Sequence, residues 1–202
     1  PPPCEAQLEL VLVLDKSGSV RSAQSSLLAF ARELVSQFTL SPTAAQVGVV
    51  EFSDDAATLI ALSSDLSAVT AAIDGASPAG GGTSVSDGLA AGLSVVNGAG
   101  SRPSVPRTIL LLTDGVQTTD GDDNTAIAQA AVVKNAGVAV VSVGFGGARV
   151  STITAMASAP SSDFAYFGSD LDAIRTHFSN AQLCELALAP KAPPPPSPPP
   201  SP

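Results

Sequence analysis

The feature that most constrains this chain is a series of short apolar segments separated by stretches of helical periodicity. Residues 8–14 read LELVLVL, and residues 108–113 and 138–143 are similarly rich in Ile, Leu and Val. Strands that are apolar at nearly every position, rather than at every second one, are buried on both faces, as in a parallel sheet covered by helices. The alternation with helices therefore predicts an α/β fold: a doubly wound, Rossmann-like sheet with helices on both faces.

The same patterning places the individual elements along the chain. Six strands are expected, at residues 8–14, 47–52, 57–62, 108–113, 138–143 and 164–167. A first helix is expected between residues 27 and 38, and further helices at 65–73, 84–96, 125–135, 150–157 and 170–182. A capping box, Ser169-x-x-Asp172, is expected to open the last helix. The glycine-rich residues 78–82 are predicted to form a flexible loop.

Two cysteines bracket this pattern, Cys4 before the first strand and Cys184 after the last helix. A pair at the two ends of a domain favours one disulfide and an oxidising compartment, the alternative being two free thiols in a cytosolic protein. We therefore expect one domain over residues 4–184. Residues 1–3 would be the end of a proline-rich segment, and residues 185–202 a tail in polyproline II conformation, because Pro-rich sequence settles into that extended helix.

The charge balance limits the class of partner. The formal net charge is −9, from 18 acidic and 9 basic residues, so a polyanion such as nucleic acid would be repelled. No apolar run reaches the length of a membrane span, so no membrane insertion is expected. A cation is the ligand that this composition favours.

Polar side chains follow two of the apolar strands at the point where each strand ends. Asp15 follows the first strand, with Ser17 and Ser19 in the loop after it, and Asp114 follows the strand at 108–113. In a doubly wound sheet, ligands bind outside the carboxyl ends of the strands where the strand order reverses. Both carboxylates would therefore face one crevice, which Thr83 could approach because three glycines precede it.

These candidate ligands are two carboxylates and three hydroxyls, all of them hard oxygen donors. Such donors suit Mg²⁺ or Mn²⁺, with Ca²⁺ as an alternative, rather than zinc or copper, which prefer His and Cys. Two carboxylates only neutralise a divalent ion, and hydroxyls add no charge. The ion would therefore accept one further anionic oxygen, which a carboxylate of a partner protein could supply.

Simpler interpretations of the same residues remain open. Ser17 and Ser19 could cap the helix that follows, since Ser is a preferred N-cap residue. The acidic residues of 120–123 are expected at a helix start rather than in a second ion site. Asp54 and Asp55 are expected in a turn that could also rim the same end of the sheet.

The spacing of the candidate ligands resembles the von Willebrand factor A domain family. D-x-S-x-S after a first strand, a Thr in a glycine-rich loop and T-D-G after a later strand match the metal-ion-dependent adhesion site of that family. The five positions are filled by Asp15, Ser17, Ser19, Thr83 and Asp114. The resemblance covers about residues 4–184. It implies a mostly parallel sheet with one antiparallel edge strand, here 57–62, a bound Mg²⁺ or Mn²⁺, and protein ligands that carry an acidic residue.

The function expected from this resemblance is metal-dependent protein binding or adhesion outside the cell. The flanking cysteines resemble those of extracellular members, and the Ser-Pro-rich tail resembles hydroxyproline-rich cell-wall glycoproteins of algae and plants. We expect a cell-wall, matrix or cell-surface protein whose isolated domain is a monomer. The alternative is a structural spacer with a vestigial metal site. Enzymatic activity is not expected, because no general base or spare nucleophile accompanies the metal ligands.

Overall fold

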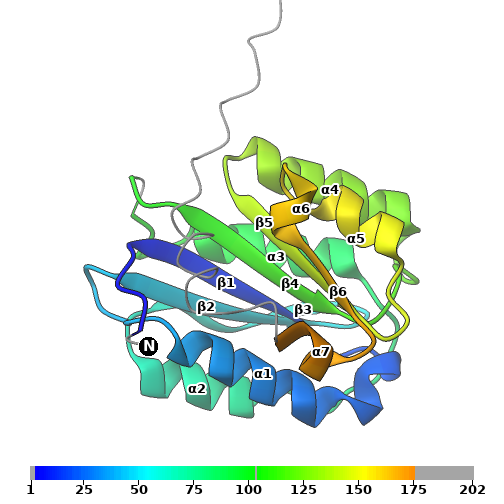
Figure 1. The fold of residues 1–202 in the computed structure, drawn as a ribbon, viewed down its shortest axis with the longest axis horizontal. Helices are drawn as coiled ribbons and strands as arrows, with labels where there is room; N and C mark the ends of the chain where they lie inside the picture. The colour runs from blue at the N-terminus through cyan, green and yellow to red at the C-terminus, as the bar shows by residue number, and fades with distance from the viewer. Residues whose placement is uncertain (1–2, 103, 176–202) are drawn as a thin grey trace, which may run out of the picture.

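The structure, a computed structural model, describes residues 3–102 and 104–175 and contains a six-stranded sheet flanked by helices (Figure 1). The strand order is β3-β2-β1-β4-β5-β6. The strands are β1 (Leu8–Asp15), β2 (Ala45–Phe52), β3 (Ala56–Ser63), β4 (Arg107–Thr113), β5 (Ala139–Phe145) and β6 (Ala165–Gly168).

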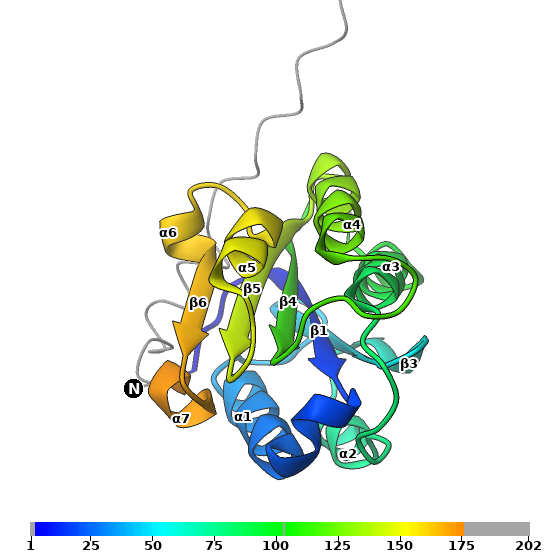
Figure 2. The same cartoon turned by 90° about the vertical axis from the view of Figure 1, so that its right-hand side faces the viewer.

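The helices form a layer on each face of the sheet. Figure 2 shows α1, α2 and α7 on one face and α3, α4 and α5 on the other. Their bounds are η1 (Gly18–Ser22), α1 (Gln24–Ser36), α2 (Leu66–Asp74), α3 (Val85–Val96), α4 (Asp123–Asn135), α5 (Val150–Met156), α6 (Ser161–Phe164) and α7 (Leu171–Arg175).

The sheet is doubly wound about β1. This strand pairs in parallel with β2 on one side and β4 on the other, and β5 and β6 continue the parallel order. Among the described strands, only the edge pair β2–β3 is antiparallel. The predicted fold class is therefore confirmed, including the antiparallel edge strand. The switch point lies where β1 and β4 end, with Asp15 as the last residue of β1.

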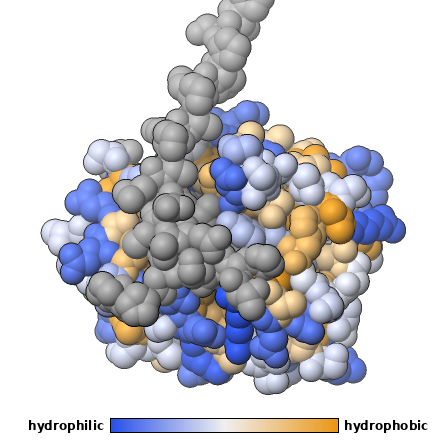
Figure 3. Space-filling view, in the orientation of Figure 1, coloured by the Kyte–Doolittle hydropathy of each residue, from blue (hydrophilic) through white to orange (hydrophobic). Residues whose placement is uncertain are grey.

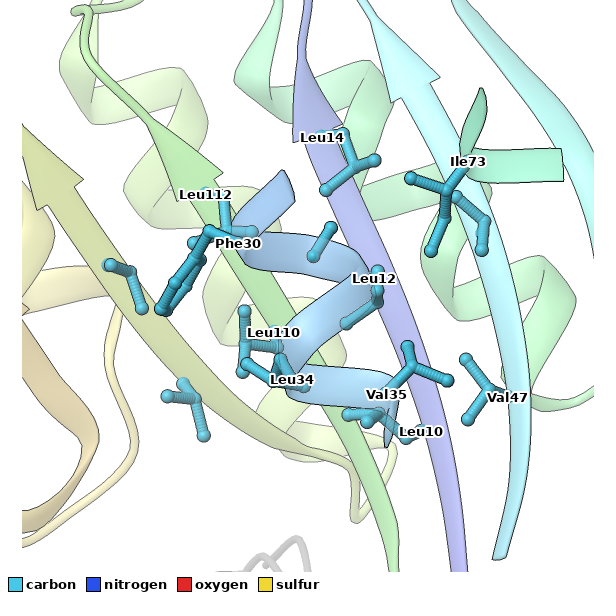
Figure 4. Packing of buried hydrophobic residues seen from close by; sticks show 14 of the residues in the cluster. Leu10, Leu12, Leu14, Phe30, Leu34, Val35, Val47, Ile73, Leu110 and Leu112 are labelled. Carbon is cyan, nitrogen blue, oxygen red and sulfur yellow. The ribbon is translucent and has the colours of Figure 1, made fainter. Parts of the chain in front are cut away.

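Alternation along β1 supplies both halves of the core. Leu10, Leu12 and Leu14 pack with α1 and α2, and Figure 4 shows them among side chains of those helices and of β4. Val11 and Val13 point to the opposite face and pack under α3. Each fully buried aliphatic side chain contributes about 1.5–3 kcal/mol relative to exposure. The apolar character of both faces is thus what places β1 at the centre of the sheet.

Two glycines let α3 lie very close to the sheet. A Cβ on Gly88 would lie 2.7 Å from Phe52 Cδ1, and one on Gly92 would lie 2.9 Å from Val13 Cγ2. Real Cβ atoms essentially never approach other heavy atoms so closely. The short separation between α3 and the sheet therefore depends on these two residues.

The structure differs from the expected elements mainly at their ends. Several strands are one or two residues longer than the apolar pattern indicated, and the short helix α6 was not expected. The capping box expected at Ser169 is not formed as predicted: Ala173 N donates instead to Asp170 Oδ1, at 2.8 Å. Helix α7 is described to Arg175, and the rest of the helix expected at 170–182 lies outside the described residues.

A buried ion pair lies at the end of the sheet opposite Asp15. Glu9, which interrupts the apolar run of β1, has 0% exposure. Arg102 Nε lies 2.6 Å from Glu9 Oε1, and Arg102 Nη2 donates to Ala44 O at 2.6 Å. The guanidinium therefore ties the segment before β4 to the starts of β1 and β2.

The N-terminal segment is held by the turn that follows α1. Cys4 N donates to Gln37 O at 2.7 Å, and Thr39 N donates to Cys4 O at 2.8 Å. Cys184 lies outside the described residues, so the disulfide between Cys4 and Cys184 stays a prediction, as do the domain boundaries and the tail at 185–202. Within 3–102 and 104–175, no helix has both the length and the apolar character of a membrane span.

Candidate metal site

Asp15 is buried and held through both carboxylate oxygens. Its exposure is 1%, Oδ1 accepts a hydrogen bond from Ser17 N at 2.7 Å, and Oδ2 accepts one from Thr113 Oγ1 at 2.6 Å. The abrupt end of a buried strand thus leaves a carboxylate whose orientation is fixed by a backbone amide on one side and a hydroxyl on the other.

The two serines after β1 form a chain of hydroxyls that leads to Asp114. Ser17 Oγ and Ser19 Oγ are 3.0 Å apart, and Ser19 Oγ donates to Asp114 Oδ1 at 2.7 Å. Ser17 occupies the N-cap position of η1 without a side-chain capping bond, and α1 begins only at Gln24. These hydroxyls therefore do not cap a helix, and the interpretation of Ser17 and Ser19 as capping residues is wrong.

Thr83 approaches the same point from the other side. Its side chain is nearly buried, at 5% exposure. A Cβ built on Gly115, next to Asp114, would lie 3.5 Å from Thr83 Oγ1 and 3.6 Å from Ser19 Oγ. The two hydroxyls therefore flank Gly115, and the structure brings together all five residues that the sequence singled out.

The loop before Thr83 is held along its length, in contrast to the flexible loop expected at 78–82. Nearly every residue from 77 to 82 has a backbone bond to another segment. The bonds are Ser77 N to Glu51 Oε2, Ala79 N to Gln24 Oε1, Gly80 N to Lys16 O, Gly18 N to Gly81 O and Gly82 N to Asp54 Oδ1. These bonds fix the path of the glycine-rich segment, so Thr83 is presented by an ordered loop.

Burial raises the pKa of both carboxyl groups at the site. For Asp15, the cost of desolvation is the largest cause; hydrogen bonds from Ser17 and Thr113 oppose it, and the nearby charge of Asp114 adds to it. The pKa of Asp114 is also raised, first by desolvation, against the hydrogen bond from Ser19. Two desolvated carboxylates that repel each other would be stabilised by a cation between them.

The donor set fits a hard divalent ion. The residues that converge offer carboxylate and hydroxyl oxygens, which suit Mg²⁺, Mn²⁺ or Ca²⁺. Over the described ranges, no three His, Cys, Asp or Glu side chains are grouped so that they could hold a metal. A site of nitrogen and sulfur ligands is therefore not formed there, and any ion at this end of the sheet would depend on the hydroxyls.

Thr113 is a site residue that the sequence reasoning missed. It is the last residue of β4, and its hydroxyl donates to Asp15 Oδ2 and accepts from Gly115 N at 3.1 Å. One buried hydroxyl thus links the carboxylate of Asp15 to the loop that carries Asp114. The available signal was its place in T-D-G, directly before Asp114, as the polar residue that ends the strand.

Three of the other acidic residues that the sequence singled out have structural partners. Asp54, in the turn between β2 and β3, accepts from Gly82 N at 2.8 Å and so lies at the rim of the site. Asp122 caps α4. Asp123 accepts from Arg149 Nη1 at 3.0 Å and Thr152 Oγ1 at 2.7 Å. The interpretation of residues 120–123 as acids at a helix start agrees with these contacts for Asp122 and Asp123.

The raised pKa values predict that, on acidification, metal affinity falls at a higher pH than it would at an ordinary carboxylate site. A carboxyl group with a raised pKa takes up its proton above the usual value of about 3.9, and that proton competes with the ion. The metal-free protein should show the opposite trend, because these groups favour folding below the ordinary pKa and lose that contribution as pH rises through the raised pKa. Calorimetric Mg²⁺ titrations and melting temperatures from about pH 4 to pH 7.5 would test this. An Mg²⁺ affinity that is constant over that range would contradict the prediction.

Comparisons with known proteins point to one family. A model of the von Willebrand factor type A domain matches residues 9–180. The collagen alpha-4(VI) chain of Mus musculus is 27% identical over 161 residues, which are 77% of this chain and 7% of the collagen chain.

Solved structures share the fold. Proximal thread matrix protein 1 from the mussel byssus has a TM-score of 0.76 at 23% identity, covering 93% of this chain and 47% of its own. A structure of that protein with a zinc-occupied MIDAS motif gives a TM-score of 0.75 at 24% identity. The pilus adhesin SpaC from Lactobacillus rhamnosus GG has a TM-score of 0.73 at 16% identity, covering 90% of this chain and 30% of its own. The chain thus spans less than half the length of each of these proteins.

Proposed function

The chain belongs to the von Willebrand factor type A domain family, and from that premise we propose that it is an extracellular protein-binding module that depends on a divalent metal. The observation that carries the proposal is the convergence of Asp15, Ser19, Thr83 and Asp114, with Ser17 behind Ser19, at the switch point of the sheet. The proposal assigns binding, not catalysis, to this site.

The chemistry of the site favours an acidic partner. Asp15 and Asp114 would supply the negative charge, and the hydroxyls of Ser17, Ser19 and Thr83 would supply neutral oxygens. When bound, Mg²⁺ or Mn²⁺ would act as a Lewis acid whose charge the protein only just neutralises. A side-chain carboxylate of the partner would be attracted to the ion. The partner would therefore bind only when the ion is bound.

The rim of the site supports the same conclusion. Arg21 lies in η1, shortly after Ser19, and its Nε donates to Ala79 O at 3.4 Å. Its side chain is exposed, and Nη2 lies 3.8 Å from where a Cβ of Gly80 would be. An exposed guanidinium beside the glycine-rich loop favours approach of an acidic group, because it contributes a positive potential at the rim.

The rest of the described surface offers little apolar area for binding. The exposed large hydrophobic residues among those described are Leu66, Val132 and Val150, each on a different helix. Figure 3 shows hydrophilic and hydrophobic residues interspersed on the face that it presents. Recognition through a metal and polar contacts is therefore favoured over a hydrophobic interface.

The similar proteins support a place in a matrix or at a cell surface. One is a collagen chain, one a thread matrix protein and one a pilus adhesin, and one structure of the thread matrix protein holds zinc in its MIDAS motif. A disulfide between Cys4 and Cys184 would fit the same oxidising compartment. These similarities support our proposal of a location outside the cell, in a wall, matrix or surface protein.

The proposal is tested by capture from matrix extracts. The immobilised chain is incubated with extract in Mg²⁺ and, in parallel, in EDTA, with the Asp114→Ala variant beside each. A protein that is retained in Mg²⁺, and lost both in EDTA and with the variant, would support the proposal. Metal binding without any metal-dependent partner would instead indicate a structural spacer that retains the site.

A further inference from the structure

We propose that Thr118 is a positioning residue that fixes Thr83 and ties it to the loop carrying Asp114. This inference rests on the proposed metal site. Thr118 lies outside the motif that the sequence revealed, four residues beyond Asp114 in the segment between β4 and α4.

The contacts between Thr118 and Thr83 run in both directions. Thr83 N donates to the hydroxyl Oγ1 of Thr118 at 2.9 Å, and Thr118 N donates back to Thr83 O, also at 2.9 Å. Thr119 N makes a second, longer bond to Thr83 O at 3.2 Å. Both backbone polar groups of Thr83 are therefore satisfied by one short segment of the β4–α4 loop.

The segment that holds Thr83 is itself anchored to α3. The side chain of Gln117 is buried, and its Nε2 donates to Ser86 Oγ at 2.8 Å and to Thr119 O at 2.7 Å. Ser86 N donates in return to Gln117 Oε1 at 3.1 Å. Because Thr83 and Ser86 are close in sequence, the β4–α4 loop is hydrogen-bonded at two points, Thr83 and Ser86, to the start of α3.

The preceding residue, Gly82, has no room for a side chain. A Cβ on Gly82 would lie 2.8 Å from Asp54 Oδ1 and 3.4 Å from Thr118 Oγ1, and it would also collide with Thr119 Oγ1. Gly82 N is bonded to Asp54 Oδ1. Thr83 therefore follows a closely packed glycine that is bonded to Asp54, and it is itself bonded to Thr118.

The consequence is that two ligands from distant parts of the chain keep a fixed relation. Asp114 and Thr118 belong to one loop, so a displacement of that loop carries Thr83 with it. Mg²⁺ requires nearly ideal octahedral geometry at about 2.0–2.1 Å, whereas Ca²⁺ accepts looser and more variable arrangements. Loss of the Thr118 hydroxyl should therefore reduce Mg²⁺ affinity more than Ca²⁺ affinity, a change that general destabilisation would not produce.

The experiment measures Mg²⁺ and Ca²⁺ affinity by calorimetry for the wild-type chain and three variants. Thr118→Val keeps the shape of the side chain and removes the acceptor of Thr83 N, and Thr118→Ser retains the hydroxyl. Thr154→Val is the matched control, because that hydroxyl bonds to Val150 O within α5. Net hydrogen-bond contributions imply a loss of about threefold to tenfold in Mg²⁺ affinity for Thr118→Val, a smaller loss for Ca²⁺, and near wild-type values for the other two.

Each outcome decides something. An Mg²⁺ affinity of Thr118→Val equal to wild type would overturn the inference, and so would an equal loss for both ions. Failure of Thr118→Ser to restore the Mg²⁺ preference would also count against it. If the wild-type chain binds neither ion, the proposed metal site is wrong and the inference is overturned with it, whereas wild-type binding with an unaltered Thr118→Val overturns the inference alone.

Discussion

Replacing Asp114 with alanine is expected to lower Mg²⁺ affinity by at least about 100-fold while leaving the fold intact. Among the described residues, Asp114 is one of two carboxylates that converge at the site, and loss of residues that merely support metal ligands already costs about 10–100-fold. Its side chain is half-buried and its described partner is the hydroxyl of Ser19, so no part of the core depends on it. Calorimetry at near-neutral pH measures the affinity, and circular dichroism checks the fold.

The matched control for this change is Asp55→Ala. Asp55 is exposed in the turn between β2 and β3, so its removal changes the net charge equally without removing a proposed ligand. We expect wild-type Mg²⁺ affinity to within about twofold, since the charge of an exposed side chain that does not contact the ion is weakened by solvent and salt. An Asp114→Ala protein with the same Mg²⁺ affinity as the Asp55→Ala control would contradict the assignment of the site.

The second large effect is expected at the opposite end of the sheet, where Arg102→Ala should destabilise the fold by about 3–5 kcal/mol. Removing one partner of a buried ion pair leaves an uncompensated charge, here the carboxylate of Glu9 at the start of the central strand β1. The loss also removes donors to Ala44 O and Pro42 O. Urea denaturation of both proteins gives the difference in the free energy of unfolding.

Two further variants show whether the cost arises from the buried charge. Arg32→Ala breaks an exposed pair with Asp74 and should change stability by less than about 1 kcal/mol. The double variant Glu9→Leu/Arg102→Leu removes both charges and should recover much of the stability, because replacing a buried pair by apolar residues is often neutral or favourable. A loss below about 1 kcal/mol for Arg102→Ala would contradict this account of Glu9.

Much of the fold and the composition of the site follow from the sequence because both depend on strand burial. The side chains of an almost continuous apolar run such as β1 can be buried on both faces only at the centre of a covered sheet, and this fixes where the carboxyl end of the strand must lie. Asp15 and Asp114 were predictable as neighbours for that reason. Glu9 in the same run was visible as an exception, but its partner Arg102 lies far along the chain, and nothing local indicates the pairing.

The supporting contacts could not be predicted for the same physical reason. The bonds from Thr118 to Thr83 and from Asp54 to Gly82 join backbone groups to side chains that only the completed fold brings together. Three consecutive glycines indicate a chain with wide conformational freedom. That freedom is removed here by bonds from other segments, which local sequence does not reveal.

The glycines of α3 connect the packing of the apolar interior to the position of Thr83. Gly88 and Gly92 allow the helix to rest against Phe52 and Val13, and the helix begins just after Thr83. The depth at which α3 is seated therefore affects the position of Thr83, together with its bonds to Thr118. A single methyl group at Gly88 would push α3 away from the sheet. The displacement would change the packing of the core and would also move the start of the helix, next to Thr83. At the proposed metal site, a change of volume under α3 would therefore also change the geometry that Thr83 offers to an ion.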